Sequence, residues 1–261
     1  MVPVIDKPPP RWRMAAARLA GERGRRLAGI VTGAPGLIRF KFRRRATARR
    51  YLRGEGLEIG GLHAPLKVPA GASVRYVDRM SVADLRRHYP ELAGEELVDV
   101  DVIDDGETLA SQSDGSADFI VANHFIEHTE DPLGTIGNHL RVLRSGGVLY
   151  MAVPDRRYTF DIDREPTPLE HLVEDHRSGP GRSRRRHLEE WARHVEHTPD
   201  EQVAARADEL DRLDYSIHFH VWTPDEFAAM LDHARTQEML PFSVAEIRQN
   251  ELEFIVILRR T

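Results

Sequence analysis

Five short apolar runs, separated by helical or polar stretches, occupy the middle of this 261-residue chain. Each run is rich in β-branched or large aliphatic residues and is too short for an ordinary helix. Strands that are apolar almost throughout are typical of parallel sheets whose two faces are both covered by helices. The pattern predicts an α/β fold with a doubly wound sheet, in which the first five strands are Leu57–Ile59, Val74–Val77, Leu97–Val102, Phe119–Ala122 and Val148–Val153.

The segments around the last of these runs complete the expected topology. The stretch DPLGTIGNHLRVLRSGG has apolar residues at helical spacing, which predicts a helix that ends at Gly146 and Gly147. Near the C-terminus, PFSVAEIRQ and ELEFIVILRR predict a hairpin, so the sheet should gain antiparallel strands. Just upstream, Thr223 and Pro224 have the residue types of an N-cap and a first helical position.

The composition excludes several classes of protein. The chain has no cysteine, which rules out disulfide scaffolds, thiolate zinc sites, iron–sulfur clusters and cysteine nucleophiles. No apolar run approaches the roughly 18 residues that a membrane span needs. The N-terminal stretch MVPVIDKPPPRWR lacks the apolar centre of a signal peptide. We therefore expect a soluble, cytoplasmic protein.

The net charge of −5 hides a strongly basic N-terminal segment. Between Arg11 and Arg53 the only acid is Glu22, and we expect residues 1–55 to form a basic helical arm ahead of a domain at 56–261. The arm could contact phosphate, an anionic membrane surface or an acidic partner. The simpler interpretation is a solvated helix that packs a few apolar residues on the domain, namely Leu27, Ile30, Leu37 and Phe40. Nucleic acid is not favoured, because aromatic side chains are not interleaved with the arginines.

Polar residues and glycines cluster where the expected strands end. In doubly wound sheets, ligands bind outside the carboxyl ends of the strands. An acid at the end of the second strand, roughly 20 residues after a glycine turn, is placed to bind ribose hydroxyls. The turn lacks the full glycine pattern that cradles a pyrophosphate, so a nucleoside cofactor without phosphate fits better. The strand-end residues are Glu58, Gly60, Gly61, Asp78, Asp104, Asp105, Asn123, His124 and Asp155.

The block SADFIVANHFIEHTEDPLGTIGNHLRVLRSGGVLYMAVPD resembles the central part of class I S-adenosylmethionine (SAM)-dependent methyltransferases. The matching residues are Asp118-Phe119, Ile126-Glu127-His128, Asp131-Pro132 and Arg141-Val142-Leu143. The resemblance extends from about Gly56 to Asp155. It implies a Rossmann-like, seven-stranded sheet with an antiparallel C-terminal hairpin, and SAM as the methyl donor.

The resemblance also implies roles for the strand-end residues. Glu58 and the turn Gly60-Gly61 would face the methionine part of SAM, and Asp78 the ribose. Asp104 or Asp105 would face the adenine amino group, and Asn123 would belong to the same cofactor site. The chain departs from the family at Leu62, where a second glycine is usual, so the amino-acid end of SAM could be held differently.

A narrower resemblance follows the fifth strand. PDRRYTFDIDREPTPLEHLVEDH is similar to a branch of sugar O-methyltransferases found beside polysaccharide biosynthesis, including those that cap methylmannose polysaccharides at the anomeric oxygen. It implies a carbohydrate acceptor, with the 1-OH of a methylated mannoside as the most specific expectation. Two alternatives stay open: a methyltransferase that acts on RNA or another small molecule, and a non-catalytic SAM-binding scaffold.

Methylation of a sugar hydroxyl needs a base or a metal, because the hydroxyl is almost un-ionised at neutral pH. The candidate bases are His124 and His128, on the loop after the fourth strand, and His171, which has Asp175 four residues later to orient its ring. Asp155 is the candidate ligand for Mg²⁺, since hard cations prefer oxygen ligands. His218 and His220 are more typical of a packed segment.

Residues 156–215 form an insertion too long for an ordinary connection. Helical stretches are expected at Leu169–His176, Arg184–His197 and Pro199–Leu213. The insertion could be a polar subdomain, the surface of a homodimer, or a lid over the acceptor. Its arginine and aspartate side chains and Trp191 would suit a carbohydrate.

Overall fold

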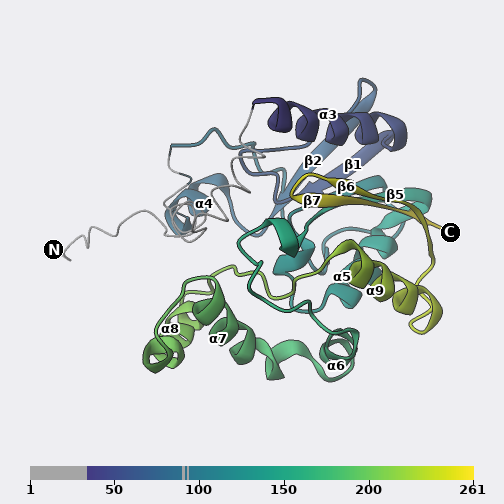
Figure 1. Ribbon diagram of the computed structural model, residues 1–261. Helices are drawn as coiled ribbons and strands as arrows, with labels where there is room; N and C mark the ends of the chain where they lie inside the picture. The colour runs from purple at the N-terminus through teal and green to yellow at the C-terminus, as the bar shows by residue number, and fades with distance from the viewer. Residues whose placement is uncertain (1–33, 90–91, 93) are drawn as a thin grey trace.

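A seven-stranded sheet forms the centre of the computed structural model, which describes residues 34–89, 92 and 94–261 (Figure 1). Its strands are β1 Gly54–Ile59, β2 Ala72–Asp78, β3 Val102–Ile103, β4 Ala117–Asn123, β5 Leu143–Pro154, β6 Phe242–Asn250 and β7 Glu253–Arg260. The α-helices are α3 Ala34–Tyr51, α4 Val82–His88, α5 Pro132–Val142, α6 Leu169–Ser178, α7 Arg184–His194, α8 Asp200–Arg212 and α9 Pro224–Thr236.

The strand order is β3-β2-β1-β4-β5-β7-β6. Strands β1 to β5 pair in parallel, whereas β7 is antiparallel to both β5 and β6. The order reverses between β1 and β4, which is where ligands bind in sheets of this kind. The predicted α/β, Rossmann-like sheet with an antiparallel C-terminal hairpin is confirmed.

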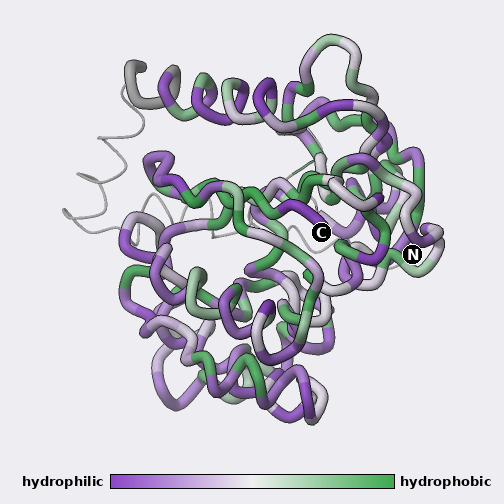
Figure 2. The backbone as a smooth tube through the Cα atoms, turned by 90° about the vertical axis from the view of Figure 1, so that its right-hand side faces the viewer, coloured by the Kyte–Doolittle hydropathy of each residue, from purple (hydrophilic) through white to green (hydrophobic). Residues whose placement is uncertain are grey.

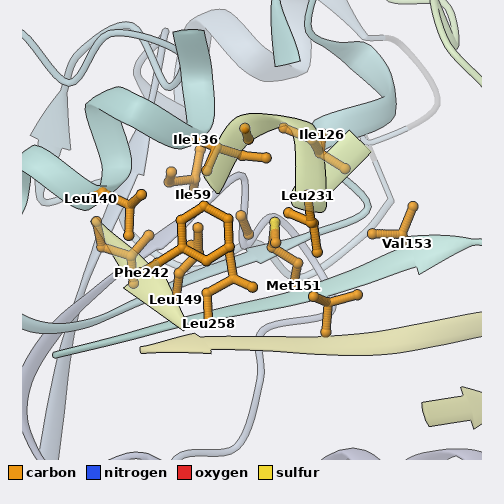
Figure 3. Packing of buried hydrophobic residues seen from close by; sticks show 14 of the residues in the cluster. Ile59, Ile126, Ile136, Leu140, Leu149, Met151, Val153, Leu231, Phe242 and Leu258 are labelled. Atoms are coloured by element: carbon orange, nitrogen blue, oxygen red, sulfur yellow. The ribbon is translucent and has the colours of Figure 1, made fainter. Parts of the chain in front are cut away.

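Helices cover both faces of the sheet, as the apolar strands require. Helix α3 lies on one face (Figure 1), where its Ala48 and the following Leu52 pack in a buried cluster with Phe119, Val121 and Tyr150. Helices α5 and α9 lie on the other face. There Figure 3 shows Ile136 and Leu140 of α5 and Leu231 of α9 against side chains of β1, β5 and β7. Apolar residues accordingly concentrate along the central strands in Figure 2.

Two predicted elements have different boundaries. The expected strand Leu97–Val102 is reduced to Val102–Ile103, because the chain before it turns and uses its amides elsewhere: Val98 N donates to Leu62 O and Asp101 N to Tyr76 O. The helix expected to end at Gly146 and Gly147 ends instead at Val142, and both glycines lie in β5. The predicted start of the last helix is confirmed, since Glu226 accepts a hydrogen bond from Thr223 N at 2.9 Å.

The insertion after β5 contains the three expected helices, α6, α7 and α8. It has an apolar centre of its own, formed by Leu188, Trp191, Val195, Ala207, Leu210, Ile217 and Phe219. Trp191 is buried there, so the expectation that its ring is available to a carbohydrate is wrong. Asp155 and Trp222, at the two ends of the insertion, form a parallel β-bridge.

Arginines of α3 pair with glutamates of the β6–β7 hairpin. Arg39 and Arg43 lie beside Glu251, Arg44 beside Glu253 and Arg50 beside Glu246. These pairs give part of the basic segment a partner within the chain itself. Leu27 and Ile30, which were expected to pack on the domain, lie outside the described residues, and the domain boundary at residue 55 stays a prediction. In the part of the chain that the structure describes, no helix has the length and apolar character of a membrane span.

Candidate active site

The carboxyl ends of β1, β2, β4 and β5 meet at one edge of the sheet, and a glycine turn follows β1. Gly60 has φ +62°, which an L-residue adopts only under strain. A Cβ on Gly61 would lie 2.9 Å from the Tyr76 ring, so a side chain has no room there. Leu62, where the resembling family has a second glycine, also has a positive φ of 45°. The backbone therefore keeps the conformation that glycine favours even where the glycine is missing.

Glu58 closes the loop that follows this turn. Its two carboxylate oxygens lie 2.8 and 3.1 Å from Leu66 N, which donates to them, and the side chain is buried on the α3 face of the sheet. Burial raises the pKa of Glu58 to about 7, against the opposing effects of the Leu66 amide and Arg44. Glu58 thus anchors the loop of residues 60–66 through the Leu66 amide. The predicted contact of Glu58 with SAM stays a prediction.

The acids after β2 and β3 lie at the same sheet edge. Asp78 ends β2 and is half-buried, and burial raises its pKa although the amides of Arg79 and Met80 oppose the shift. Asp104 accepts hydrogen bonds from the backbone and hydroxyl of Ser111 at 3.0 and 2.7 Å. Asp105 is exposed and caps the next turn through Glu107 N at 2.7 Å. All three carboxylates thus accept hydrogen bonds from nearby backbone amides.

Two surface cavities lie near the glycine turn. A cavity of about 570 Å³ is lined by His63, Pro65, Tyr76 and residues between Glu95 and Asp101. A much smaller one, of about 10 Å³, is lined by Gly61 and Asp78 and is bordered by Leu97 and Val98. The segment that replaces the expected third strand thus packs close to the predicted ribose site.

Asn123, the last residue of β4, has buried side-chain atoms without a partner. Neither its amide nitrogen nor its amide oxygen makes a hydrogen bond within the described structure. A buried amide without partners costs about 1–3 kcal/mol. Such a group at the strand-order reversal fits a bound nucleoside cofactor, because the cofactor's hydroxyl and amino groups could satisfy it.

His124 follows Asn123 and is held by a buried carboxylate on β7. Its backbone lies in the left-handed region at φ +50°, which is uncommon outside glycine and is often found at functional sites. The His124 Nε2 atom is 2.7 Å from Glu253 Oε2. Glu253 also accepts hydrogen bonds from Arg44 Nε at 2.8 Å and from Asn250 at 2.7 Å. Burial alone would raise the pKa of Glu253, but Arg44 and His124 hold it down at about 2, so the carboxylate stays ionised.

Glu127 lies on the other side of the His124 ring, and the sequence reasoning did not select it as a site residue. Its Oε1 is 3.8 Å from His124 Nδ1, and neither of its buried carboxylate oxygens makes a hydrogen bond. Burial raises the pKa of Glu127 to about 7. The Ile126-Glu127-His128 match was the signal that could have pointed to it, but the motif alone does not reveal that this carboxyl is buried without a partner.

The sequence also matches a family model described as "Methyltransferase domain" over residues 37–234. The chain belongs to this family. The family's methyl donor is SAM, and the partnerless Asn123 and the confined glycine turn fit that cofactor. No curated protein matches this methyltransferase significantly.

Solved structures similar to this methyltransferase include three with low sequence identity. A SAM-dependent methyltransferase from Aquifex aeolicus is 14% identical, with 83% of this chain and 87% of that chain covered and a TM-score of 0.45. One from Methanosarcina mazei is 20% identical, with 81% and 95% covered and a TM-score of 0.44. An O-methyltransferase family protein from Burkholderia thailandensis is 13% identical, with 96% and 63% covered and a TM-score of 0.46.

The other candidate catalytic residues of the methyltransferase have protein partners. His128 Nδ1 lies 2.8 Å from Ile217 O and 3.0 Å from the Ser216 hydroxyl, and burial lowers the pKa of His128 to about 3. Both oxygens of the buried Asp155 accept hydrogen bonds from the Arg157 side chain, at 2.9 and 2.7 Å. His171 lies on α6 in the insertion, with its Nε2 3.1 Å from Asp175 Oδ2. Of the four predicted catalytic residues, His124 is thus the one that lies at the strand-order reversal. Its ring lies between the buried carboxyl groups of Glu127 and Glu253.

Proposed function

We propose that this methyltransferase methylates a hydroxyl group of a carbohydrate and that His124 is its general base. The observation that supports the proposal is the 2.7 Å contact between His124 Nε2 and the ionised Glu253. In a neutral imidazole held this way, Nε2 carries the proton and Nδ1 keeps its lone pair. Nδ1 can then accept the proton of a hydroxyl acceptor. A carboxylate on the far side of a histidine also stabilises the imidazolium that results.

The remaining residues of the site would bind and orient. SAM supplies an electrophilic methyl group when it is bound. The glycine turn admits its amino-acid end close to the backbone, Asp78 accepts hydrogen bonds from its ribose, and Asn123 pairs with its polar groups. Glu127, at 3.8 Å from His124 Nδ1, adds negative charge beside the imidazolium when it is ionised. Positioning of this kind is the largest task in a displacement reaction.

A carbohydrate acceptor is favoured by the resemblance of residues 154–176 to sugar O-methyltransferases, with the 1-OH of a methylated mannoside as the specific candidate. An oxygen acceptor is also favoured by the carboxylate-held base, since a hydroxyl must lose its proton during transfer. Trp191 is buried, so the proposed aromatic surface for a sugar ring is instead the exposed Tyr158 at the start of the insertion.

Magnesium at Asp155 does not fit the donor atoms that surround this residue. Mg²⁺ needs several oxygen ligands in octahedral geometry, whereas the Asp155 carboxylate is engaged by Arg157 on both oxygens. Among the described residues, neither of the groups with three metal-binding side chains includes Asp155. The proposed reaction therefore does not use Mg²⁺ bound at Asp155.

The test is methyl transfer from radiolabelled SAM to short mannosides and glucosides, with and without magnesium. His124→Ala should lower turnover on the order of 10²–10⁴-fold, the usual contribution of a positioned base, while calorimetry shows unchanged SAM affinity. His197→Ala, a change at an exposed histidine of the insertion, is the control and should keep the wild-type rate. Near-normal turnover in His124→Ala would remove it as the base. SAM binding without methyl transfer to any hydroxylated acceptor would favour a non-catalytic SAM-binding scaffold. Methyl transfer to RNA would favour an RNA methyltransferase.

A further inference from the structure

Three histidines and an aspartate come together between α6, α7 and the segment that returns to the sheet. His171 lies on α6, His187 on α7 and His220 on the segment that returns to the sheet, and their ring nitrogens lie within 4.8 Å of one another. His171 Nε2 is 2.9 Å from His187 Nε2. Asp175 Oδ2 is 3.1 Å from His171 Nε2 and 3.8 Å from His187 Nε2. Three histidines thus converge from three segments of the chain, and Asp175 lies beside two of them.

Two ring nitrogens of this cluster are buried without a hydrogen-bond partner: His187 Nδ1 and His220 Nδ1. His220 is fully buried, and its Nε2 lies 3.2 Å from the backbone oxygen of Glu130. That contact places the ring proton on Nε2 and leaves the Nδ1 lone pair free. Neutral imidazole is the state that binds metals, and the burial of both rings disfavours their charged form.

We propose that His171, His187, His220 and Asp175 bind one Zn²⁺ ion. With zinc–nitrogen and zinc–oxygen bonds of about 2.0–2.1 Å, the ligand atoms of a tetrahedral site lie about 3.3 Å apart. The distances of 2.9, 3.1 and 3.8 Å among His171, His187 and Asp175 bracket that value. Imidazole with one carboxylate is a zinc donor set, whereas Mg²⁺ and Ca²⁺ prefer oxygen alone.

Groups around the ligands could orient them. Ser183 donates a hydrogen bond to Asp175 Oδ1 at 2.7 Å, which leaves Oδ2 for the metal. The Glu130 carbonyl accepts from His220 Nε2 and fixes that ring, whereas the Glu190 carboxylate lies 4.0 Å from His187 Nδ1, beyond hydrogen-bond distance. Outer partners of this kind are usual for metal-binding histidines. Two contacts must change: the exposed Arg186 lies beside both ring nitrogens of His171, at 3.4 Å from Nε2, and it would turn toward solvent when the metal binds.

Four protein ligands make a closed, structural site rather than a catalytic one. The metal would tie α6 to α7 and both to the returning segment, next to the loop that carries His124. His171 would then be a metal ligand and not the base of methyl transfer. The rival explanation is a hydrogen bond between two neutral imidazoles, one donating and the other accepting, with no metal.

The experiment uses the full chain without a histidine tag, produced in zinc-supplemented medium. Elemental analysis after dialysis should find about one zinc ion per chain, as expected for a closed site. Replacement by Co²⁺ should give the visible absorption of a tetrahedral site, and added Zn²⁺ should abolish it. His171→Gln, at the most accessible ligand, should lose both signals, whereas His197→Gln should keep both.

The two readouts use the same folded chain, so the proposal does not depend on activity. A folded wild-type chain that retains no zinc and gives no tetrahedral Co²⁺ spectrum would overturn it and favour the imidazole hydrogen bond. Stoichiometric zinc that persists in a folded His171→Gln chain would also overturn the assignment of these ligands.

Discussion

Replacing Glu127 by glutamine should change how the free energy of unfolding depends on pH. Glu127 is fully buried, both of its oxygens lack partners, and burial raises its pKa from 4.5 to about 7. The folded state therefore binds its proton more tightly than the unfolded state does. The stabilisation associated with this proton is complete below about pH 4.5 and is lost as the pH rises through about 7.

The size of the effect follows from the two pKa values. A pKa difference between 4.5 and about 7 corresponds to about 3.4 kcal/mol at 1.36 kcal/mol per pKa unit. The range from about pH 5 to about pH 8 covers most but not all of this change, so we expect about 2–3 kcal/mol over it. Over that range Glu127→Gln should become more stable relative to the wild type by this amount. A constant cost from the new amide cancels, because only the change with pH is compared.

Urea unfolding, followed by the fluorescence of the buried Trp191 and Trp222, measures the free energy of unfolding of the wild type and of Glu127→Gln at each pH. Glu201→Gln, at an exposed position in the first turn of α8, is the control and should track the wild type at every pH. Parallel stability curves for wild type and Glu127→Gln, within about 0.5 kcal/mol, would show that Glu127 does not titrate as a buried, partnerless carboxyl group.

Three further predictions concern the cofactor, the base and the packing of α3. Asp78→Ala should weaken SAM binding by about 1.5–3 kcal/mol, the scale of hydrogen bonds to a charged group, and unchanged affinity by calorimetry would remove Asp78 from the ribose site. Glu253→Gln should lower kcat by about tenfold or more and leave the KM for SAM unchanged, because an amide holds the His124 ring but does not stabilise its imidazolium; an unaltered kcat would contradict the proposed pair. Leu52→Ala should lower the free energy of unfolding by about 2–5 kcal/mol, because Leu52 is fully buried between the end of α3 and the sheet; a loss below about 0.5 kcal/mol in urea unfolding would contradict this packing.

The sheet and the helices of the insertion were predictable because local patterns determine them. Apolar runs identified β1, β2, β4 and β5, and helical spacing identified α6, α7 and α8. The third strand was mispredicted because Leu97–Val102 has strand-like residues, yet its amides bond to Leu62 and Tyr76 outside a regular ladder. The end of α5 was mispredicted because two glycines suggested a cap where the sheet instead extends the strand.

The partners of the site residues could not be predicted, because they come from distant parts of the sequence. His124 was selected by its place after β4, but Glu253 lies 129 residues later, and Arg44 precedes both. Asp155 was selected as a strand-end oxygen ligand for Mg²⁺. Its partner Arg157 is only two residues away, but the sequence does not show that this side chain turns back onto both carboxylate oxygens. The pairing of His171 with Asp175 was predictable from helical spacing, whereas its approach to His187 and His220 depends on how three segments fold back.

The β-bridge between Asp155 and Trp222 gives the insertion the character of an exchangeable cassette. The chain leaves the sheet and returns to it at adjacent points, with Arg156 N donating to Trp222 O at 3.0 Å. The distance between Asp155 and Trp222 is therefore independent of the number of residues that connect them. Each doubling of that number costs only about 0.6 kcal/mol of loop-closure entropy. The cassette has its own apolar centre, formed around Trp191 and Leu210, and all four proposed zinc ligands lie within it. Evolution, or an engineer, could therefore exchange this unit while the seven-stranded sheet stays as it is.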